Sequence, residues 1–369
     1  MSDAFFNRPR IVWATQSATP HDRRFIETLV DSGWSVVFLS AGGNLRDLRL
    51  AARHKPFVVA DLETMPDMPE RGIAPRLKDA IAIYQPQLVW AGPLSTVAHE
   101  VAEVTSVPLV AMSWGYDLLR DAAINPAIAE SIAATMVRAN RVHVDCDAGR
   151  KAAVKLGAPQ ENIFQFPWGI DLTAFPLRED RNQDHQLTVV SARSMEPVYD
   201  VATTIEAFAQ LTCERPDLNA RLVLVGSGSL EHELHTTAAD LDVDSKIIWM
   251  GRVTEADLQR VIADAAVYVS SSSVDGSSIT LLQAMATGVT PIVSDVGGNS
   301  EWIRHGETGL LFPAGDVPAL AACLEKTLSD AGLRNALGSA AHEEVAKHGD
   351  WAEHRITFIN ECSALSGLT

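Results

Sequence analysis

The stretch SSSVDGSSITLLQAMATGVTPIVSDVGGNSEWI, residues 271–303, indicates how this chain folds. An apolar run over 266–271 predicts a buried strand that leads into a Gly-Ser loop, and a helix opens near Ser278 or Ile279. After the turn at Gly288, the apolar run over 290–294 predicts the next strand. Two strands joined through a helix form a βαβ unit, so this stretch predicts a parallel α/β fold.

The same alternation of strand and helix runs through the whole chain. Short runs that are apolar on both faces, with Val and Ile prominent, predict buried parallel strands. In the first half they span 10–15, 34–40, 57–60, 87–92, 108–113, 141–145 and 162–166, and in the second half 187–192, 221–226, 246–251, 266–271, 290–294 and 309–312. Three helical stretches end the chain. We therefore predict two doubly wound, Rossmann-like domains.

A polar, charged segment over 172–186 interrupts this pattern and is typical of a linker. We expect an N-terminal domain over 1–171, a C-terminal domain over 187–349, and a helix over 350–369 that crosses back to the N-terminal domain. Doubly wound domains bind ligands at the carboxyl ends of their strands. The cleft between two such domains is therefore the expected active site.

Charge and composition exclude several classes of protein. The 369 residues include 30 Lys and Arg and 47 Asp and Glu, a net charge of −17. Residues 1–171 carry 17 basic and 19 acidic side chains (net −2), and residues 172–369 carry 13 and 28 (net −15). So acidic a chain repels phosphate backbones, which argues against nucleic-acid binding. Without an apolar run of about 18 residues or a signal sequence, we expect a cytoplasmic globular protein.

The sequence gives little evidence of a metal site. The four cysteines are far apart, show no CxxC spacing, and are expected to be small core residues in a reducing compartment: Cys146, Cys213, Cys323 and Cys362. Two triplets, 145–147 and 242–244, fit an Asp-x-Asp metal pattern, but such triplets are common by chance in a chain with 47 acidic residues. We predict no metal site and no cofactor.

The loop before the helix at 279 is a candidate anion site. Gly276, Ser277 and Ser278 place unpaired backbone N–H groups, two hydroxyls and the positive end of a helix dipole together. That site has the right size for a diphosphate. The alternative is an ordinary serine N-cap without a ligand.

The wider segment resembles the retaining glycosyltransferases of the GT-B fold, specifically glycosyltransferase family 4. That family has a glutamate, seven residues, a second glutamate, an Ala-Met-Ala-x-Gly turn and a Gly-Gly-x-x-Glu loop. The matching residues here are Asp275, Gln283, the turn 284–288 and the loop 297–301 that ends on Glu301. The resemblance implies that Asp275 faces the transferred sugar and Gln283 the nucleotide ribose. Because Gln283 is neutral, donor binding is expected to be weaker by about 1 kcal/mol.

Other segments of the second half extend the resemblance. Arg193 matches a family arginine on the donor diphosphate, but the family's lysine is missing from the loop that follows. The turn with Gly226 and Gly228 is implied to lie against the donor, and the backbone around Gly251, Arg252 and Val253 to hold the base. With Gly276, Ser277, Ser278 and Ile279, these residues form the expected donor site.

The first half resembles the family less closely. The loop after its first strand holds His21 and Arg24, which would place positive charge in the cleft. Many family members have His-Gly-x-Asp at a later strand end, where this chain has Trp114, Gly115, Tyr116 and Asp117. Trp114, Tyr116 and Asp117 are therefore candidate acceptor or cleft residues, although a tryptophan at a strand end is as often a packing residue.

The leading hypothesis is a metal-independent, retaining glycosyltransferase that moves a hexose-type sugar from a nucleotide-diphosphate sugar to a glycan, lipid-linked or small-molecule hydroxyl. Two alternatives remain: a non-catalytic sugar-nucleotide-binding protein, suggested by Gln283 and the missing lysine, and a sugar-nucleotide epimerase of the same fold. Arg46, Arg49 and Arg53 share one helical face and would support weak contact with anionic lipid. A solvated helix face is the alternative there.

Overall fold

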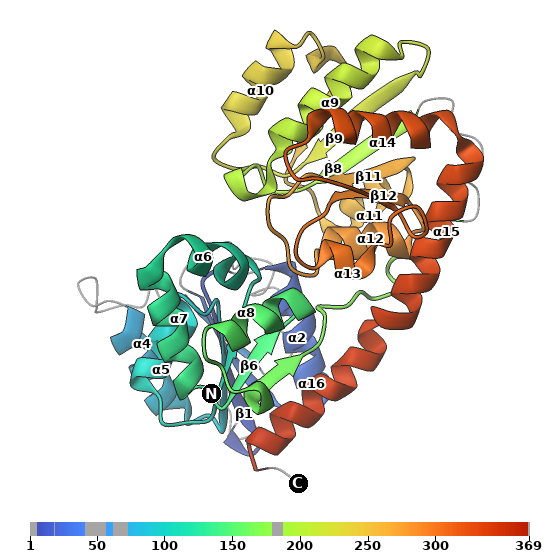
Figure 1. The fold of residues 1–369 in the computed structure, drawn as a ribbon. Helices are drawn as coiled ribbons and strands as arrows, with labels where there is room; N and C mark the ends of the chain where they lie inside the picture. The colour runs from blue at the N-terminus through green and yellow to red at the C-terminus, as the bar shows by residue number, and fades with distance from the viewer. Residues whose placement is uncertain (1–5, 18, 41–56, 62–72, 179–186, 368–369) are drawn as a thin grey trace. The chain divides into compact units, whose positions relative to one another are not determined.

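The computed structural model describes residues 6–17, 19–40, 57–61, 73–178 and 187–367. The chain divides into two compact units, Met1–Pro167 with Ala352–Thr369, and Trp168–Trp351 (Figure 1). The boundary lies between Pro167 and Trp168, whereas the sequence led us to expect it after Asp171. The reason is that Ile170 and Phe175, at 2% and 1% exposure, are buried in the core of the second unit. Residues 179–186 of the expected linker are outside the described residues.

The first unit is built on a parallel sheet of seven strands in the order β3-β2-β1-β4-β5-β6-β7. Their bounds are β1 Arg10–Thr15, β2 Ser35–Ser40, β3 Phe57–Asp61, β4 Leu88–Gly92, β5 Leu109–Met112, β6 Arg141–Val144 and β7 Ile163–Gln165. Each coincides with an apolar run in the sequence, so the strand predictions are confirmed. The order reverses direction between β1 and β4, as in doubly wound folds.

The second unit has a parallel sheet of six strands in the order β10-β9-β8-β11-β12-β13. Their bounds are β8 Leu187–Ala192, β9 Ala220–Val225, β10 Ile247–Gly251, β11 Val267–Ser270, β12 Thr290–Ser294 and β13 Leu310–Phe312. These strands are also confirmed. Here the order reverses between β8 and β11, which makes the carboxyl ends of these two strands the switch point of the sheet.

Helices cover both faces of the first sheet. The longer helices of this unit are α2 Pro20–Asp31, α4 Ile73–Tyr84, α5 Val97–Val104, α7 Pro126–Arg138, α8 Asp147–Lys155 and α16 Trp351–Leu365, and the short α6 spans Ala122–Ile124. One face packs against α4, α5, α7 and α8. On the other face Trp13 of β1 and Trp90 of β4 stack at 5.4 Å and meet Phe25 of α2 and Phe358 of α16. The C-terminal helix is therefore part of the first unit's core.

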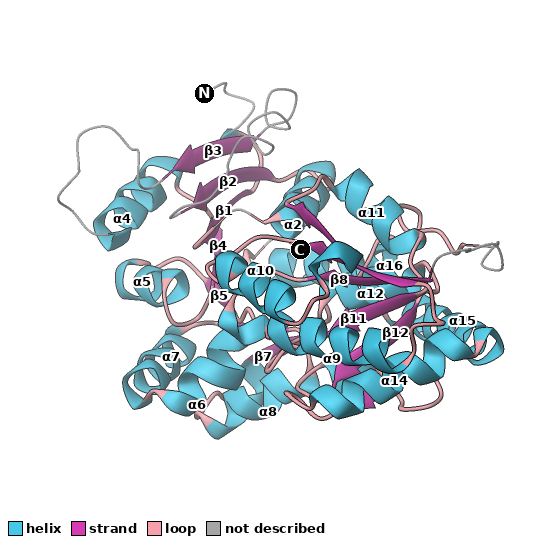
Figure 2. Ribbon diagram, turned by 90° about the horizontal axis from the view of Figure 1, so that it is seen from above, coloured by secondary structure: helices cyan, strands magenta, loops and turns pink. Residues whose placement is uncertain are grey.

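The second sheet is also covered on both faces (Figure 2). Its helices are α9 Val201–Glu214, α10 Glu231–Asp240, α11 Glu255–Ala263, α12 Ile279–Ala286, α13 Asn299–Trp302, α14 Val317–Ser329 and α15 Ala331–His348. One core lies under α9, α10 and α14, and the other under α11, α12 and α15. Neighbouring strand residues such as Val189 and Val190 enter opposite cores, which explains why these strands are apolar on both faces.

The cysteine interpretation needs a correction. Cys146 and Cys362 are buried, but Cys213 is exposed and Cys323 is only half-buried. The last two lie on α9 and α14, which have solvent on one side. Their wide spacing in the sequence therefore did not mean that all four are core residues.

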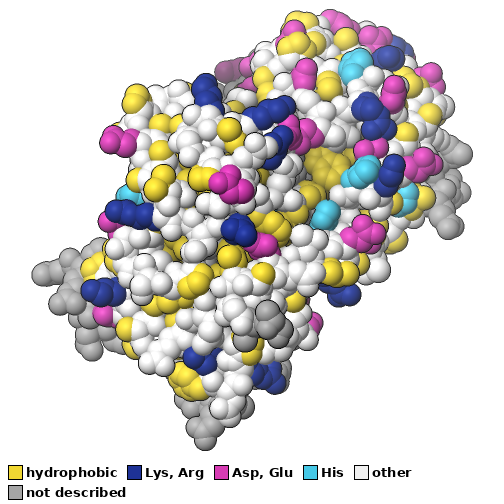
Figure 3. All heavy atoms as spheres, turned by 60° about the horizontal axis from the view of Figure 1, so that its bottom comes forward, with side chains coloured by type: hydrophobic (Ala, Val, Ile, Leu, Met, Phe, Trp, Pro, Cys, Tyr) yellow, Lys and Arg dark blue, Asp and Glu magenta, His cyan; other side chains and the backbone are white. Residues whose placement is uncertain are grey.

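The surface is mixed in charge. On the face drawn in Figure 3, Lys and Arg side chains are interspersed with Asp and Glu. No helix among the described residues is long and apolar enough to cross a membrane. Arg46, Arg49 and Arg53, which we expected to form a basic face, lie outside the described residues.

Candidate functional site

The carboxyl edge of the second sheet gathers most of the predicted donor residues. Arg193 follows β8, and Asp275 lies in the loop after β11, so the two residues flank the switch point of the sheet. Ligands of open parallel sheets bind at this position, because the loops on either side turn away from each other and leave a crevice. The sequence-predicted pair is therefore located where the topology predicts a ligand site.

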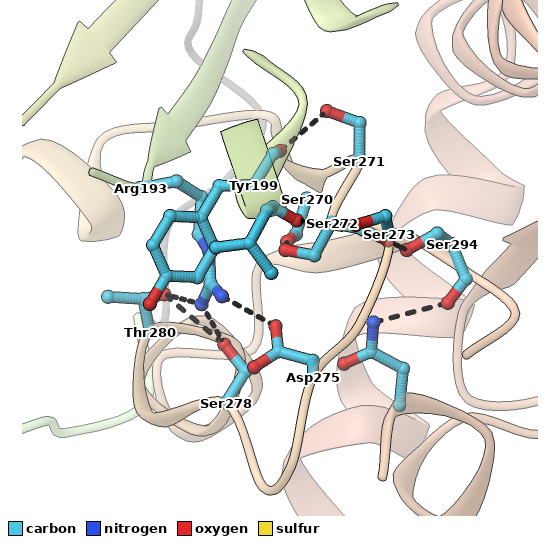
Figure 4. Close-up of polar contacts among 12 residues, drawn as sticks. Arg193, Tyr199, Ser270, Ser271, Ser272, Ser273, Asp275, Ser278, Thr280 and Ser294 are labelled. Atoms are coloured by element: carbon cyan, nitrogen blue, oxygen red, sulfur yellow. Dashed lines mark hydrogen bonds and ion pairs between the residues drawn. The ribbon is translucent and has the colours of Figure 1, made fainter. Parts of the chain in front are cut away.

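Arg193 and Asp275 form a buried ion pair, although 82 residues separate them in the chain. Arg193 Nη2 donates to Asp275 Oδ2 at 2.6 Å, and Nη1 donates to Ser278 Oγ at 2.5 Å (Figure 4). The two charged side chains are only 9% and 12% exposed. The fold thus brings together three of the residues that were expected at the donor site.

Burial is the main electrostatic influence on this pair. It raises the pKa of the Asp275 carboxyl, and the guanidinium of Arg193 opposes that rise. Burial lowers the pKa of Arg193, but the Asp275 carboxylate together with Tyr268 and Tyr199 more than offsets this effect, so the pKa of Arg193 is raised overall. A 2.6 Å contact between two buried groups of opposite charge is an ion pair that an incoming diphosphate would have to share or exchange.

The N-terminus of α12 lies beside the guanidinium. Ser278 is the N-cap residue, yet among the described residues its side chain makes no capping bond, because Oγ accepts from Arg193 instead. Gly298 packs directly on the loop: a Cβ there would lie 2.4 Å from Gly276 O, and its N–H donates to Asp275 O at 3.0 Å. Ser277 is buried and accepts from Trp302 Nε1 at 3.3 Å. The loop geometry is therefore fixed by tertiary packing.

The turn after β9 contains two glycines, Gly226 and Gly228, because the loop after β8 leaves no room for a side chain there. Gly226 has φ +134°, and a Cβ there would lie 2.2 Å from Arg193 O. A Cβ on Gly228 would lie 2.4 Å from Met195 O. These glycines therefore let the turn approach the Arg193 loop closely enough to support it, a role that Gly-x-Gly alone did not reveal.

Two charged side chains hold this turn from either side. Glu196 accepts from Ser229 N at 2.9 Å and from Ser229 Oγ at 2.6 Å. Arg252 Nε donates to Ser227 Oγ at 3.0 Å. The preceding residue, Gly251, ends β10 and has φ +60°. Arg252 is exposed and Val253 is half-buried. Sequence reasoning missed Glu196, because its role depends on a contact 33 residues along the chain.

The predicted ribose residue lies inside α12. Gln283 is 5% exposed, and among the described residues its Oε1 has no hydrogen-bond partner. A buried amide oxygen without a hydrogen-bond partner destabilises the folded protein. Such an atom is explained where a bound ligand supplies the missing hydrogen bond. Ile279 at the start of the helix is half-buried, and Glu301 on α13 is exposed.

In the first unit, Asp117 is held by several hydrogen bonds. It is fully buried and accepts from Ser113 Oγ at 2.6 Å, Leu94 N at 2.8 Å and Trp114 N at 3.1 Å. Burial raises its pKa to about 6. The carboxyl therefore ties the loops after β4 and β5 together, a contact pattern that the sequence does not reveal.

The other first-unit candidates lie in the loop after β5 and at the start of α2, where His21 and Arg24 are helical and not in a loop as expected. Trp114, Tyr116 and Arg24 are half-buried, and the Arg24 guanidinium is 6.0 Å from the ring centre of Phe25. The side chain of His21 is outside the described residues. A further group was missed by the sequence reasoning: buried Asp22 accepts from Trp13 Nε1 at 2.7 Å, and burial raises its pKa to about 6.

Acidic triplets do not gather into a metal site. Among the described residues, no cluster of three His, Cys, Asp or Glu side chains has the arrangement needed to hold a metal ion. Asp147 pairs with Arg150 and Lys151, and Asp244 accepts from Trp249 Nε1. Each of these acids thus has a local partner.

Known structures identify the class of fold. The Anabaena protein HepE, crystallised with UDP and glucose, matches with a TM-score of 0.81 and 17% identity over 96% of this chain and 100% of that one. Sucrose-phosphate synthase from Thermosynechococcus elongatus matches with a TM-score of 0.81 and 19% identity over 98% and 100%. The chain has the GT-B fold, as the sequence resemblance implied.

The sequence comparison adds a family match. Residues 177–344 match the family model for glycosyl transferases group 1. D-inositol 3-phosphate glycosyltransferase of Pseudarthrobacter chlorophenolicus is 29% identical over 50% of this chain and 46% of its own length. Phosphatidyl-myo-inositol mannosyltransferase of Mycolicibacterium smegmatis is 29% identical over 55% and 52%. The chain thus spans about half the length of the curated relatives it matches.

Proposed function

We propose that this protein is a retaining glycosyltransferase that transfers a sugar from a UDP-sugar to a hydroxyl acceptor without a metal ion. One observation supports this most directly: a buried Arg193–Asp275 pair beside the N-terminus of α12, at the switch point of the sheet. The names of the relatives support the same reaction class, and HepE was crystallised with UDP-glucose. UDP is therefore the first donor nucleotide to test.

In this proposal the donor lies along the carboxyl edge of the second sheet. The diphosphate binds between Arg193 and the N–H groups of Ser278 and Ile279, where a guanidinium and a helix dipole both favour negative charge. Asp275 accepts hydrogen bonds from hydroxyls of the transferred sugar. Gln283 Oε1 gains a ribose hydroxyl as its missing partner, and the backbone at 251–253 holds the base.

The chemical step needs positioning and charge stabilisation more than a protein nucleophile. The bond between the sugar C1 and the β-phosphate oxygen breaks, and the acceptor oxygen bonds to C1 on the same face. The acceptor proton passes to the leaving diphosphate. Arg193 and the helix N-terminus then stabilise the negative charge that develops on UDP.

The acceptor is proposed to be a glycan, a lipid-linked sugar or a small molecule. Residues at the carboxyl edge of the first sheet, Trp114, Tyr116 and Arg24, are its proposed contacts. Asp117 is assigned a positioning role, because its carboxyl is buried under the loop that bears Trp114.

A panel of nucleotide sugars tests the proposal. The protein is incubated with UDP-, GDP- and ADP-linked hexoses in the presence of EDTA, and free nucleotide and sugar products are measured. Slow release of UDP together with free sugar, absent in Arg193→Ala, is the expected result. An epimerised UDP-sugar would establish the epimerase instead, and tight binding without any product would establish a non-catalytic sugar-nucleotide-binding protein.

A further inference from the structure

The loop that follows β8 has a single positive charge. Residues 193–200 read Arg-Ser-Met-Glu-Pro-Val-Tyr-Asp, so Arg193 is the one cation in a segment that also contains two acids. Of these acids, Glu196 is engaged with Ser229. A diphosphate bound here would therefore depend on the position of one guanidinium.

Tyr199 lies on the face of that guanidinium. The Cζ atom of Arg193 is 4.2 Å from the centre of the Tyr199 ring, well within the roughly 6 Å of a cation–π contact (Figure 4). Asp275 and Ser278 bind the edges of the same group at 2.6 and 2.5 Å. Arg193 is thus held on one face and at two edges, and its side chain is only 9% exposed.

The backbone of Tyr199 is itself fixed. The residue ends a single 3-10 turn, Pro197–Tyr199, and its N–H donates to Glu196 O at 2.9 Å. The next residue, Asp200, has a left-handed conformation with φ +44°, and its carbonyl accepts from Ser271 Oγ at 2.6 Å. Ser271 is buried after β11. The backbone that bears the ring is therefore held from both sides of the switch point, by the loop after β8 and by Ser271 after β11.

We infer that Tyr199 is a positioning residue of the phosphate site: its ring keeps the Arg193 guanidinium beside the N-terminus of α12, so that one fixed cation serves this site. The inference about binding rests on the proposed function. A long arginine side chain loses rotamer entropy when it binds an anion, and a ring that restricts it beforehand lowers that cost. The ring also shields the ion pair from water, which strengthens its interaction with an anion.

Variants of Tyr199 separate the ring from the rest of the loop. Tyr199→Phe keeps the aromatic face, whereas Tyr199→Leu and Tyr199→Met remove it and keep most of the apolar volume. Val198→Ala is the matched control, because it truncates the same turn and leaves Tyr199 and Arg193 in place. Calorimetry then gives the Kd of each variant for UDP and for uridine, which lacks the phosphates.

We expect Tyr199→Phe and Val198→Ala to bind UDP within about twofold of wild type. Loss of the aromatic face should weaken UDP binding by roughly tenfold and leave uridine binding within about twofold. Unchanged UDP binding in both Tyr199→Leu and Tyr199→Met, or an equal loss for UDP and uridine, would overturn the inference.

A measurement on the ligand-free protein distinguishes failure of this inference from failure of the proposed function. With ¹⁵N-labelled arginine, the Arg193 Nε–Hε signal, assigned by its loss in Arg193→Lys, should show the ring-current shift of Tyr199. The shift should persist in Tyr199→Phe and vanish in Tyr199→Leu. If wild type binds no nucleotide but shows this shift, the proposed function fails and the positioning of Arg193 stands; if no shift exists, the positioning is wrong.

Discussion

Arg193 and Asp275 compensate each other's charge inside the second unit. Both are nearly buried, so removal of one leaves the other as an unpaired charge, which typically costs 3–5 kcal/mol. The same pair is proposed to meet the diphosphate and the sugar. At the residue scale, stability and binding are therefore coupled, and a variant has to be measured for both.

The first prediction concerns Arg193→Ala. The diphosphate would lose its cation, so the Kd for UDP should rise by ~2–3 kcal/mol in free-energy terms. Asp275→Ala should lower turnover more than UDP affinity, because Asp275 is proposed to face the sugar. Calorimetry and donor turnover check both variants, with Arg260→Ala as the control, because that side chain is 73% exposed on α11. UDP affinity unchanged in Arg193→Ala would contradict the assignment of the phosphate site.

The second prediction concerns Gln283, whose Oε1 is buried without a partner among the described residues. Gln283→Ala should weaken UDP binding. Gln283→Glu should keep or increase the transferase activity, since a carboxylate accepts stronger hydrogen bonds from the ribose hydroxyls of the donor. In the free protein the same variant should lower the Tm, because it buries a charge. If neither variant changes UDP affinity, Gln283 does not face the ribose.

At the scale of elements, the loops after β8, β9 and β11 support one another. The turn after β9 packs against the Arg193 loop through glycines, and the loop after β11 is held by Gly298. Because these contacts involve backbone atoms, they cannot relax by a change of side-chain rotamer. The site geometry should accordingly respond to changes in residues that touch no ligand.

Two glycine variants form a matched pair that tests this support. Gly226→Ala would place a Cβ 2.2 Å from Arg193 O at φ +134°, and should destabilise the second unit by about 2–3 kcal/mol and weaken UDP binding. Gly251→Ala has φ +60° with open space around the new Cβ, so a loss of about 1 kcal/mol is expected. Urea unfolding and UDP calorimetry measure both. Equal effects of the two changes would argue against the packing role of Gly226.

At the scale of the whole molecule, two units with separate hydrophobic cores share one chain. A ligand that binds one unit should stabilise that unit by mass action, by about 2.7 kcal/mol at a concentration 100-fold above Kd. Thermal unfolding should therefore show a UDP-dependent transition for the second unit. For the first unit we expect a pH dependence to which a buried histidine contributes, beside the buried carboxyls of Asp22 and Asp117.

The prediction for the first unit rests on His143 of β6. The ring is fully buried and stacks on Phe166 at 4.2 Å, and burial lowers its pKa from 6.5 to about 4. A lowered folded-state pKa contributes stability that is present above pH 6.5 and is lost as the pH falls through 4, by about 3 kcal/mol in total. The difference in unfolding free energy between wild type and His143→Phe should shrink or reverse over that range. A difference independent of pH would contradict this role.

Several features could be predicted from the sequence because they depend on local order. Each strand was predicted from a short apolar run between two helical stretches. A strand of a parallel sheet is buried on both faces, so its neighbouring residues are mostly apolar and the pattern is visible within a few residues. Arg193 and Asp275 were identified from the resemblance to the family's motifs, and Ser278 from the Gly-Ser loop that opens the next helix. Their contacts agree with the expected site because all three follow β8 or β11 at one edge of the sheet.

Other features were decided only by the tertiary structure. Gly226 is required because the carbonyl of Arg193 lies too close for a Cβ. The Asp117 carboxyl accepts from the backbone of Leu94, and the backbone of Tyr199 is held by Ser271. The boundary at 167 depends on the packing of Ile170 and Phe175. In each case the partner residue is distant in the sequence, and the number of residues between two positions does not determine how far apart they lie in space or how deeply they are buried. These contacts exist only once the strands are aligned, which is why they could not be derived from the order of residues.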